Sequence, residues 1–333
     1  AGVLADLKLA FSTEGYVPFN GSLLLSLPSG FTVAQGSSVC IDQRNLGDQT
    51  TLYVAAVNPA LRTVLLRTIP ELGRAPRYLP SVRDASVVVT KVRNPSAGMT
   101  GSFVVQTFTG PEAEGDAIDI ASAVPGISVL PGRLRNVQVS VDGNDARKLA
   151  TYSFSLGTTG AIPGDGKFVI SFPFGYFLTN VQLLSSNAFG ATGVPTASYS
   201  GQQVFVQLGG TFGGPQLDPT DGVSFSLSGI VNPGAGVGNA PYIVQSTFNS
   251  PNNVVDEASV NGIDIITGMF LAQSVSLSSL IAGRGTLVTV NITTAGFVPK
   301  NAKIAVLFPE GVAPSLPAAS TVTASECCEP GGG

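Results

Sequence analysis

Apolar and polar residues alternate in short runs through almost the whole chain, as in the segments 102–107, 167–172 and 303–308. A period of two places the apolar side chains on one face of a β-strand. Gly, Pro, Asn and Ser bound the runs, which return about every ten residues, as is typical of an antiparallel β-sandwich. Sustained helical periodicity is absent, and the best helical candidate, 58–72, is short and contains Pro59 and Pro70. The pattern predicts an all-β protein.

One motif occurs three times: Gly-x-Val/Ile-Pro, followed by Pro-x-Gly with a constant separation of ten residues between the two prolines. Its first glycines lie 145 and then 136 residues apart. Constant spacing inside the motif and variable spacing between copies is typical of duplicated domains with variable loops. The copies consist of Gly15, Pro18, Pro28 and Gly30; Gly160, Pro163, Pro173 and Gly175; and Gly296, Pro299, Pro309 and Gly311.

Each position in this motif has a sufficient backbone reason. The first proline begins a strand, where its missing amide removes no ladder hydrogen bond. The second proline presets φ in a turn in which the following glycine accepts positive φ. We therefore favour a scaffolding role for the motif over a ligand groove or a site of proline modification.

A second motif, Asn-Pro, occurs as Asn94-Pro95 and Asn232-Pro233, each followed by a predicted strand. Asn before Pro initiates turns by bonding its own backbone two residues on. Further along, the segment 118–120 matches 263–265, since both read Ile-Asp-Ile. The glycines at 234, 236 and 238 lack the following helix and the lysine that a phosphate-binding loop requires.

The repeated motifs and the strand pattern predict tandem Ig-like antiparallel β-sandwich domains. The expected boundaries are 1–132 for a first repeat that lacks its first strand, 133–269 for a complete second repeat, and 270–333 for the first half of a third. The missing strand is expected because 136–141 and 273–277 precede the motif in the later copies, whereas only fourteen residues precede Gly15. The chain therefore reads as part of a longer array.

The amino-acid composition limits the compartments and partners that fit this chain. Charged residues make up 11% of the chain, against roughly 25% in typical soluble proteins. A surface covered by uncharged polar residues is common outside the cell. The net charge of −4 without a basic cluster argues against nucleic acid and anionic lipid as partners. No run of apolar residues is long enough for membrane insertion in this segment.

Histidine is absent, which removes the commonest general base and transition-metal ligand. We expect no enzyme activity, no cofactor and no metal site. The acidic groups are interpreted first as solvated loops and turns, with calcium binding and a glycosidase-type carboxylate pair as the less favoured alternatives. They are Glu112, Glu114, Asp116 and Asp119; Asp256, Glu257 and Asp264; and Asp142 with Asp145.

Two N-glycosylation sequons are present, at Asn20 and Asn291, whereas Pro95 bars the one at Asn94. The three cysteines are Cys40, Cys327 and Cys328. An odd number implies a buried free thiol or partners elsewhere. Tryptophan, which often stacks on sugar rings, is absent, so that a lectin would depend on Tyr and Phe.

The repeated Gly-x-Val/Ile-Pro, Pro-x-Gly and Asn-Pro pattern resembles the Ig-like repeats of the large flagellar membrane glycoproteins that coat algal cilia. The resemblance implies a glycosylated extracellular coat protein that takes part in adhesion and gliding at the cell or cilium surface. Its partners would be neighbouring repeats, copies of itself, and glycans or surface proteins. The alternative is the stalk module of an adhesin that binds carbohydrate or protein.

Overall fold

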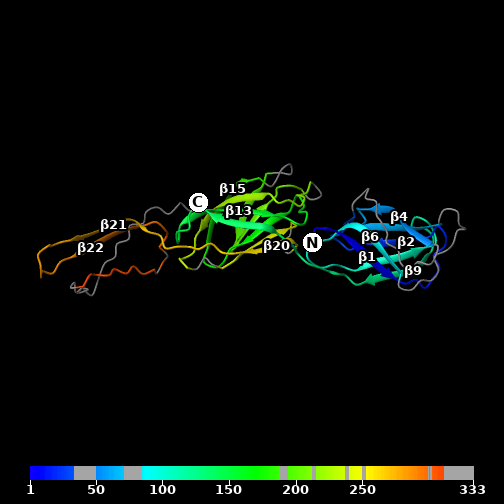
Figure 1. Ribbon diagram of the computed structural model, residues 1–333, viewed down its shortest axis with the longest axis horizontal. Helices are drawn as coiled ribbons and strands as arrows, with labels where there is room; N and C mark the ends of the chain where they lie inside the picture. Colours follow the sequence, from blue (N-terminus) through cyan, green and yellow to red (C-terminus); the bar gives the residue numbers. More distant parts are fainter. Residues whose placement is uncertain are drawn as a thin grey trace. The chain divides into compact units, whose positions relative to one another are not determined.

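The computed structural model describes residues 1–33, 50–70, 85–187, 194–211, 215–236, 240–249, 253–298, 300 and 302–310. All regular secondary structure in these ranges consists of β-strands (Figure 1). The expected all-β class with antiparallel β-sandwiches is confirmed. The chain divides into two compact units, Ala1–Gly296 and Phe297–Gly333, and the described residues of the second contain no strand. The helical candidate 58–72 overlaps a hairpin of β4 (Thr50–Asn58) and β5 (Thr63–Pro70).

The first sandwich has two antiparallel sheets with the strand orders β1-β6-β3 and β4-β5-β2-β8-β9. Apolar residues of both sheets form one core, which includes Leu9, Leu25, Leu66, Val87 and Phe103. β7 and β10 form a separate short antiparallel pair. The remaining bounds are β1 Leu4–Phe11, β2 Ser22–Ser26, β3 Thr32–Val33, β6 Ala85–Arg93, β7 Gly98–Met99, β8 Phe103–Phe108, β9 Ala117–Val124 and β10 Ser128–Val129.

The second sandwich has the strand orders β12-β13-β18-β15 and β11-β20-β19-β14-β17-β16. All pairs are antiparallel except β11 with β20. Its core is rich in aromatic rings, and Phe154 stacks on Phe225 with ring centroids 5.3 Å apart. The bounds are β11 Gly132–Arg133, β12 Arg135–Val141, β13 Leu149–Gly157, β14 Lys167–Ser171, β15 Phe177–Ser186, β16 Thr196–Ser200, β17 Gln203–Gln207, β18 Val223–Val231, β19 Tyr242–Thr247 and β20 Val254–Val260.

The strand alternation predicted from the sequence produces these cores directly. In β13, Ala150, Tyr152, Phe154 and Leu156 are buried, and polar residues between them face away from the core. Burying such a side chain stabilises the fold by about 1.5–3 kcal/mol relative to leaving it exposed. The alternation therefore determines which face of each sheet packs against the other.

A third copy begins with the hairpin of β21 (Phe270–Leu277) and β22 (Val288–Thr294). Val275 pairs with Val290 and Leu277 with Val288. In the second sandwich the pairs are Val139 with Phe154 and Val141 with Tyr152, so the two hairpins share one register at a separation of 136 residues. All of β21 is exposed. In the first sandwich β1 is an edge strand among the described residues, with no strand in the place of β12.

Candidate functional site

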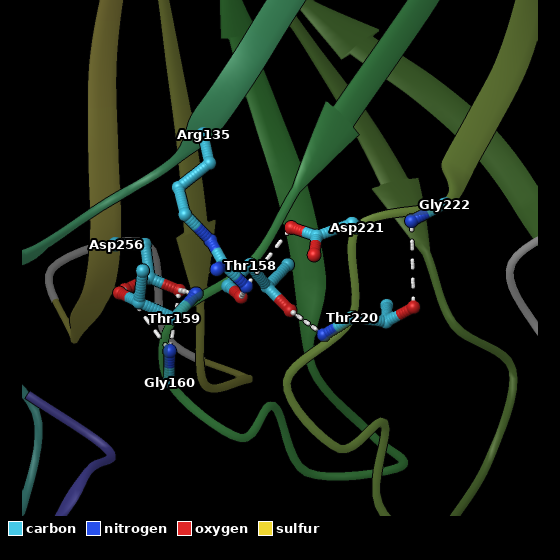
Figure 2. A network of polar contacts seen from close by, with 8 residues as sticks. All are labelled: Arg135, Thr158, Thr159, Gly160, Thr220, Asp221, Gly222 and Asp256. Atoms are coloured by element: carbon cyan, nitrogen blue, oxygen red, sulfur yellow. Dashed lines mark hydrogen bonds and ion pairs between the residues drawn. The ribbon is translucent and has the colours of Figure 1, made fainter.

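A buried carboxylate holds the repeat motif of the second sandwich. Asp256 in β20 is 0% exposed and accepts hydrogen bonds from the Thr159 amide (3.2 Å), the Thr159 hydroxyl (2.5 Å) and the Gly160 amide (3.0 Å). Ser246 in β19 donates a longer bond of 3.4 Å. Figure 2 shows Thr159 and Gly160 gathered around this carboxylate. A buried carboxylate requires such donors, because burial without them is strongly unfavourable.

The first sandwich contains the equivalent arrangement. Asp119 in β9 accepts hydrogen bonds from the Gly15 amide (3.4 Å) and the Thr107 hydroxyl (3.2 Å). Its own amide donates to that hydroxyl, just as the Asp256 amide donates to the Ser246 hydroxyl. Asp119 is therefore the counterpart of Asp256. The correspondence of 118–120 with 263–265 was wrong, because strand register, rather than a three-residue similarity, sets equivalence in a sheet.

Glycine is required beside this carboxylate for steric reasons. A Cβ added at Gly160 would overlap Cγ1 of Val255, and one at Gly15 would overlap Cγ2 of Ile118. Val255 directly precedes Asp256 and Ile118 directly precedes Asp119. The motif glycine thus fits against the strand that carries the carboxylate, in both sandwiches.

The turn after the motif proline contains a further glycine that is not part of the Gly-x-Val/Ile-Pro motif. The Gly21 amide donates to the Pro18 carbonyl, and the Gly166 amide to the Pro163 carbonyl, both at 2.8 Å. A Cβ at Gly21 would lie 2.8 Å from the carbonyl oxygen of Phe108, which leaves no room for a side chain. The signal was available in the sequence, since both glycines follow the proline by three residues.

The second turn of the motif carries positive φ at its glycine. Gly30 has φ of 89° and Gly175 has φ of 100°, values that side-chain-bearing residues rarely adopt. A Cβ at Gly30 would lie 2.7 Å from Cβ of Pro95, so this turn packs on the Asn-Pro turn of the same sandwich. In the third copy Pro309 is exposed, whereas Pro299 and Gly311 lie outside the described residues.

Backbone contacts of one kind occur twice within Ala1–Gly296, each joining the start of a copy to its end, next to the motif glycine of the following copy. The Ala1 nitrogen donates to the Leu130 carbonyl at 2.7 Å, and the Ala146 amide donates to the Ile266 carbonyl at 2.8 Å. A Cβ at Gly160 would lie 2.8 Å from the Ala1 oxygen, and a Cβ at Gly296 would lie 2.6 Å from the Ala146 oxygen. The motif glycine therefore also permits a close backbone approach from the preceding copy.

Asn232 of the Asn-Pro motif is buried and bonds a distant loop. Its side-chain amide donates to the carbonyls of Gly143 (2.9 Å) and Asp145 (2.7 Å), and its oxygen accepts from the Tyr152 hydroxyl at 2.5 Å. The sequence predicted a turn in which Asn bonds its own backbone. In the structure the Asn232 side chain bonds the loop from Asp142 to Arg147 instead, because the carbonyls of this loop lie within reach of its buried amide. The backbone amide of the equivalent Asn94 donates to the Val3 carbonyl, just as the backbone amide of Asn232 donates to the Lys148 carbonyl.

Three tyrosine hydroxyls meet in the core of the second sandwich. Tyr176 and Tyr242 share a hydrogen bond, and Tyr152 contacts both rings. Burial raises the pKa of Tyr152 and of Tyr242 far above the ordinary phenol range. The phenols of Tyr152 and Tyr242 therefore stay protonated near neutral pH and do not suit acid–base chemistry there.

The polar residues around Arg135 are partly open to solvent. Arg135 forms an ion pair with Asp221 at 3.0 Å and donates to the Thr158 carbonyl at 3.1 Å (Figure 2). The Thr220 amide in turn donates to the Thr158 hydroxyl at 3.2 Å. Because the two charged side chains are 46% and 65% exposed, the pair contributes little to stability.

The acidic residues considered for calcium or catalysis are dispersed. Glu112 pairs with Arg67 at 3.4 Å, and Asp145 pairs with Lys148 at 3.2 Å. Asp119 is engaged by Thr107. Across the described ranges, no three Asp, Glu or Cys side chains are grouped so that they could hold a metal ion.

The sequon asparagines Asn20 and Asn291 are both exposed. Asn20 lies in the turn after Pro18 with φ of 64°, and Asn291 lies in β22. The hydroxyl of Ser22, the third residue of the first sequon, donates to the Gly110 carbonyl at 2.7 Å. Cys40, Cys327 and Cys328 lie outside the described residues. Within those residues no helix has the length and hydropathy to cross a membrane.

No protein-family model matches this sequence, and no curated protein matches it. Among solved structures, it is similar to a C-terminal fragment of the major pilin of Streptococcus agalactiae, with 12% identity and a TM-score of 0.28 over 78% of this chain and 85% of the fragment. It is also similar to the N-terminal domain of a Streptococcus gordonii adhesin, with 11% identity and a TM-score of 0.27 over 74% of this chain and 57% of that one. The C-terminal domain of an antigen I/II-family protein of Streptococcus pyogenes gives 11% identity and a TM-score of 0.23, over 77% of this chain and 91% of that one. Nothing about the function of this chain follows from likeness at these levels.

Proposed function

We propose that this chain is a non-enzymatic structural and adhesive segment of an extracellular surface protein, built from tandem β-sandwich repeats that space and present a contact surface. Its repeats span 1–132, 133–269 and 270–333. The protein belongs to the coat of a cell or cilium, and its partners are neighbouring repeats, copies of itself and surface glycans or proteins.

The observation that carries this proposal is the repetition of structural contacts instead of a reactive site. Asp119 holds Gly15 as Asp256 holds Gly160, and the backbone contact of Ala1 with Leu130 recurs between Ala146 and Ile266. The recurring contacts fix turns, and the motif glycine lets the backbone of the preceding copy approach closely. Such reuse supports a role in which the array itself is the working part.

The scarcity of charge supports an extracellular setting, and the exposed Asn20 and Asn291 are proposed glycosylation sites. If both carry glycans, peptide N-glycosidase increases the electrophoretic mobility of the protein isolated from its source. Asn20→Gln and Asn291→Gln variants each remove one step of that shift. A protein whose mobility the enzyme leaves unchanged would refute the glycosylation.

Surface location is tested with antibodies raised against the chain and applied to intact cells that produce it. We expect labelling without permeabilisation and loss of the label after brief protease treatment of intact cells. Antigen that becomes accessible only after permeabilisation would overturn the proposed function.

A further inference from the structure

The outer face of one sheet in the second sandwich is covered by serine hydroxyls. In the sheet β12-β13-β18-β15, the residues Val139, Phe154 and Phe225 lie on the core side or pack against it. Their neighbours along each strand therefore lie on the other side. On that side, a hollow is lined by Ser140, Ser153, Ser155, Ser185, Ser224 and Ser226, with Gln138 at its margin.

Strand register arranges these serines in rows. Ser140 of β12 pairs with Ser153 of β13, which pairs with Ser226 of β18, which pairs with Ser185 of β15. One serine from each of the four strands thus forms a continuous row. Neighbouring positions in such a row are about 4.8 Å apart, and the next row along the strands is about 6.7 Å away. We call this set of six serines the serine face.

The hollow over the serine face is shallow and open, with a volume of about 530 Å³. Ser153 and Ser226 bond each other at 2.8 Å. The hydroxyls of Ser140, Ser155 and Ser185 form no hydrogen bond with any described residue, although their strands are paired within the sheet. They are free to bond to solvent or to a ligand.

The chemistry of the lining excludes most classes of ligand. None of its residues is charged, so an ion gains no counter-charge there. An apolar ligand would leave the hydroxyls that it covers without hydrogen-bond partners, which is unfavourable. An added peptide strand needs a free sheet edge, whereas this is a sheet face. A protein interface usually depends on aromatic or Arg anchors in pockets, and the lining offers a shallow surface of short hydroxyls.

An uncharged ligand with many hydroxyl groups fits the lining and is not excluded by these arguments. Each serine hydroxyl both donates and accepts a hydrogen bond, as does each hydroxyl of a sugar. A ligand with hydroxyls at regular intervals can bond several positions of the grid at once. We infer that the serine face of the second sandwich is a binding site for an uncharged oligosaccharide chain. The inference rests on the proposed function, because it assigns the contact surface of that adhesive segment.

The residues at the equivalent positions differ between the other two copies, which predicts where binding should and should not occur. In the third copy, register places Ser274 opposite Asn291 and Ser276 opposite Thr289, so the polar, uncharged character continues. In the first sandwich, Lys8, Ala10 and Val88 occupy the positions of Ser153, Ser155 and Ser226. Binding is therefore expected at the second sandwich and not at the first.

The test uses amide NMR of the full chain titrated with the neutral hexasaccharides cellohexaose, laminarihexaose, maltohexaose and mannohexaose up to about 10 mM. We expect at least one to shift amides of β12, β13 and β18, while those of β1 and β6 stay in place. Ser155→Glu, which fills the centre of the hollow, is expected to weaken that binding about tenfold or more. The control Ser198→Glu introduces the same charge on exposed β16 of the other sheet and is expected to leave binding unchanged.

Three results of the sugar titration would overturn the inference. They are the absence of shifts with all four sugars, shifts that lie outside the serine face, and binding that Ser155→Glu leaves intact. If sedimentation shows self-association that Ser155→Glu abolishes, the occupant is a second copy and the sugar assignment is wrong. The antibody labelling of intact cells is independent of this variant, so the failure of the sugar site and of the surface location are distinguishable.

Discussion

Removing the carboxylate of Asp256 gives the sharpest test of how the repeat is held together. The change Asp256→Ala deletes the acceptor for the Thr159 and Gly160 amides and for two hydroxyls. The hydroxyls can rotate toward other acceptors. The two amides are fixed by the backbone, and the Gly160 amide is buried.

A buried donor left without a partner costs about 1–3 kcal/mol. The buried Gly160 amide bears this full cost and the partly buried Thr159 amide about 1 kcal/mol, so that, less the gain from no longer burying a charge, the expected loss is about 1–3 kcal/mol in the free energy of unfolding of the second sandwich. The matched change Asp119→Ala removes an amide bond of 3.4 Å at a site that is only partly buried. Water can replace that bond, so we expect a loss of about 1 kcal/mol in the first sandwich.

The assay is urea unfolding of the full chain, followed by hydrogen exchange with peptide resolution so that the two sandwiches are observed separately. The control is Glu257→Ala, because Glu257 follows Asp256 on β20 but is exposed and should change stability by less than about 0.5 kcal/mol. If Asp119→Ala costs as much as Asp256→Ala, or if Asp256→Ala behaves like Glu257→Ala, the carboxylate does not hold the motif as we argue.

Three further predictions follow from the second sandwich. Gly160→Ala forces a Cβ onto Val255 and is expected to lower thermal stability, whereas Gly222→Ala, in open space, should leave the melting temperature nearly unchanged; equal effects would contradict the steric argument. Burial raises the folded-state pKa of Tyr152 and Tyr242 above the unfolded value of about 10. Their contribution to the stability of the second sandwich is therefore complete below pH 10 and is lost as the pH rises further. Hydrogen exchange should show the second sandwich weakening before the first in alkali. Tyr152→Phe removes the donor to Asn232 and is expected to cost about 1–2 kcal/mol in urea unfolding; no loss would show that the bond is dispensable.

Much of the architecture could be predicted from local sequence. The period-two alternation in 167–172 identifies β14, because a strand must place successive side chains on opposite faces. The spacing of Gly160, Pro163, Pro173 and Gly175 marks a duplicated unit, since turns require specific residue types at specific positions. Each of these signals lies within a stretch of about fifteen residues, which is why periodicity and spacing detect them.

The contacts that join distant segments could not be predicted in this way. Asp256 meets Gly160 across 96 residues, and the Ile-Asp-Ile similarity pointed to Asp264 instead. Asn232 bonds the loop around Gly143, although its local sequence suggested a self-contained turn. In both cases the partner is chosen by which strands are adjacent, and adjacency is a property of the sheet.

The sequence by itself therefore determined that this protein is a tandem array of antiparallel β-sandwiches with recurring turns, poor in charge and without histidine chemistry. Only the tertiary structure decided which carboxylate supports the repeat motif and that serines from four strands form one face. The physical reason is that alternation and turn preferences act between near neighbours in the chain. Register brings together residues such as Ser140 and Ser185, which no local pattern relates.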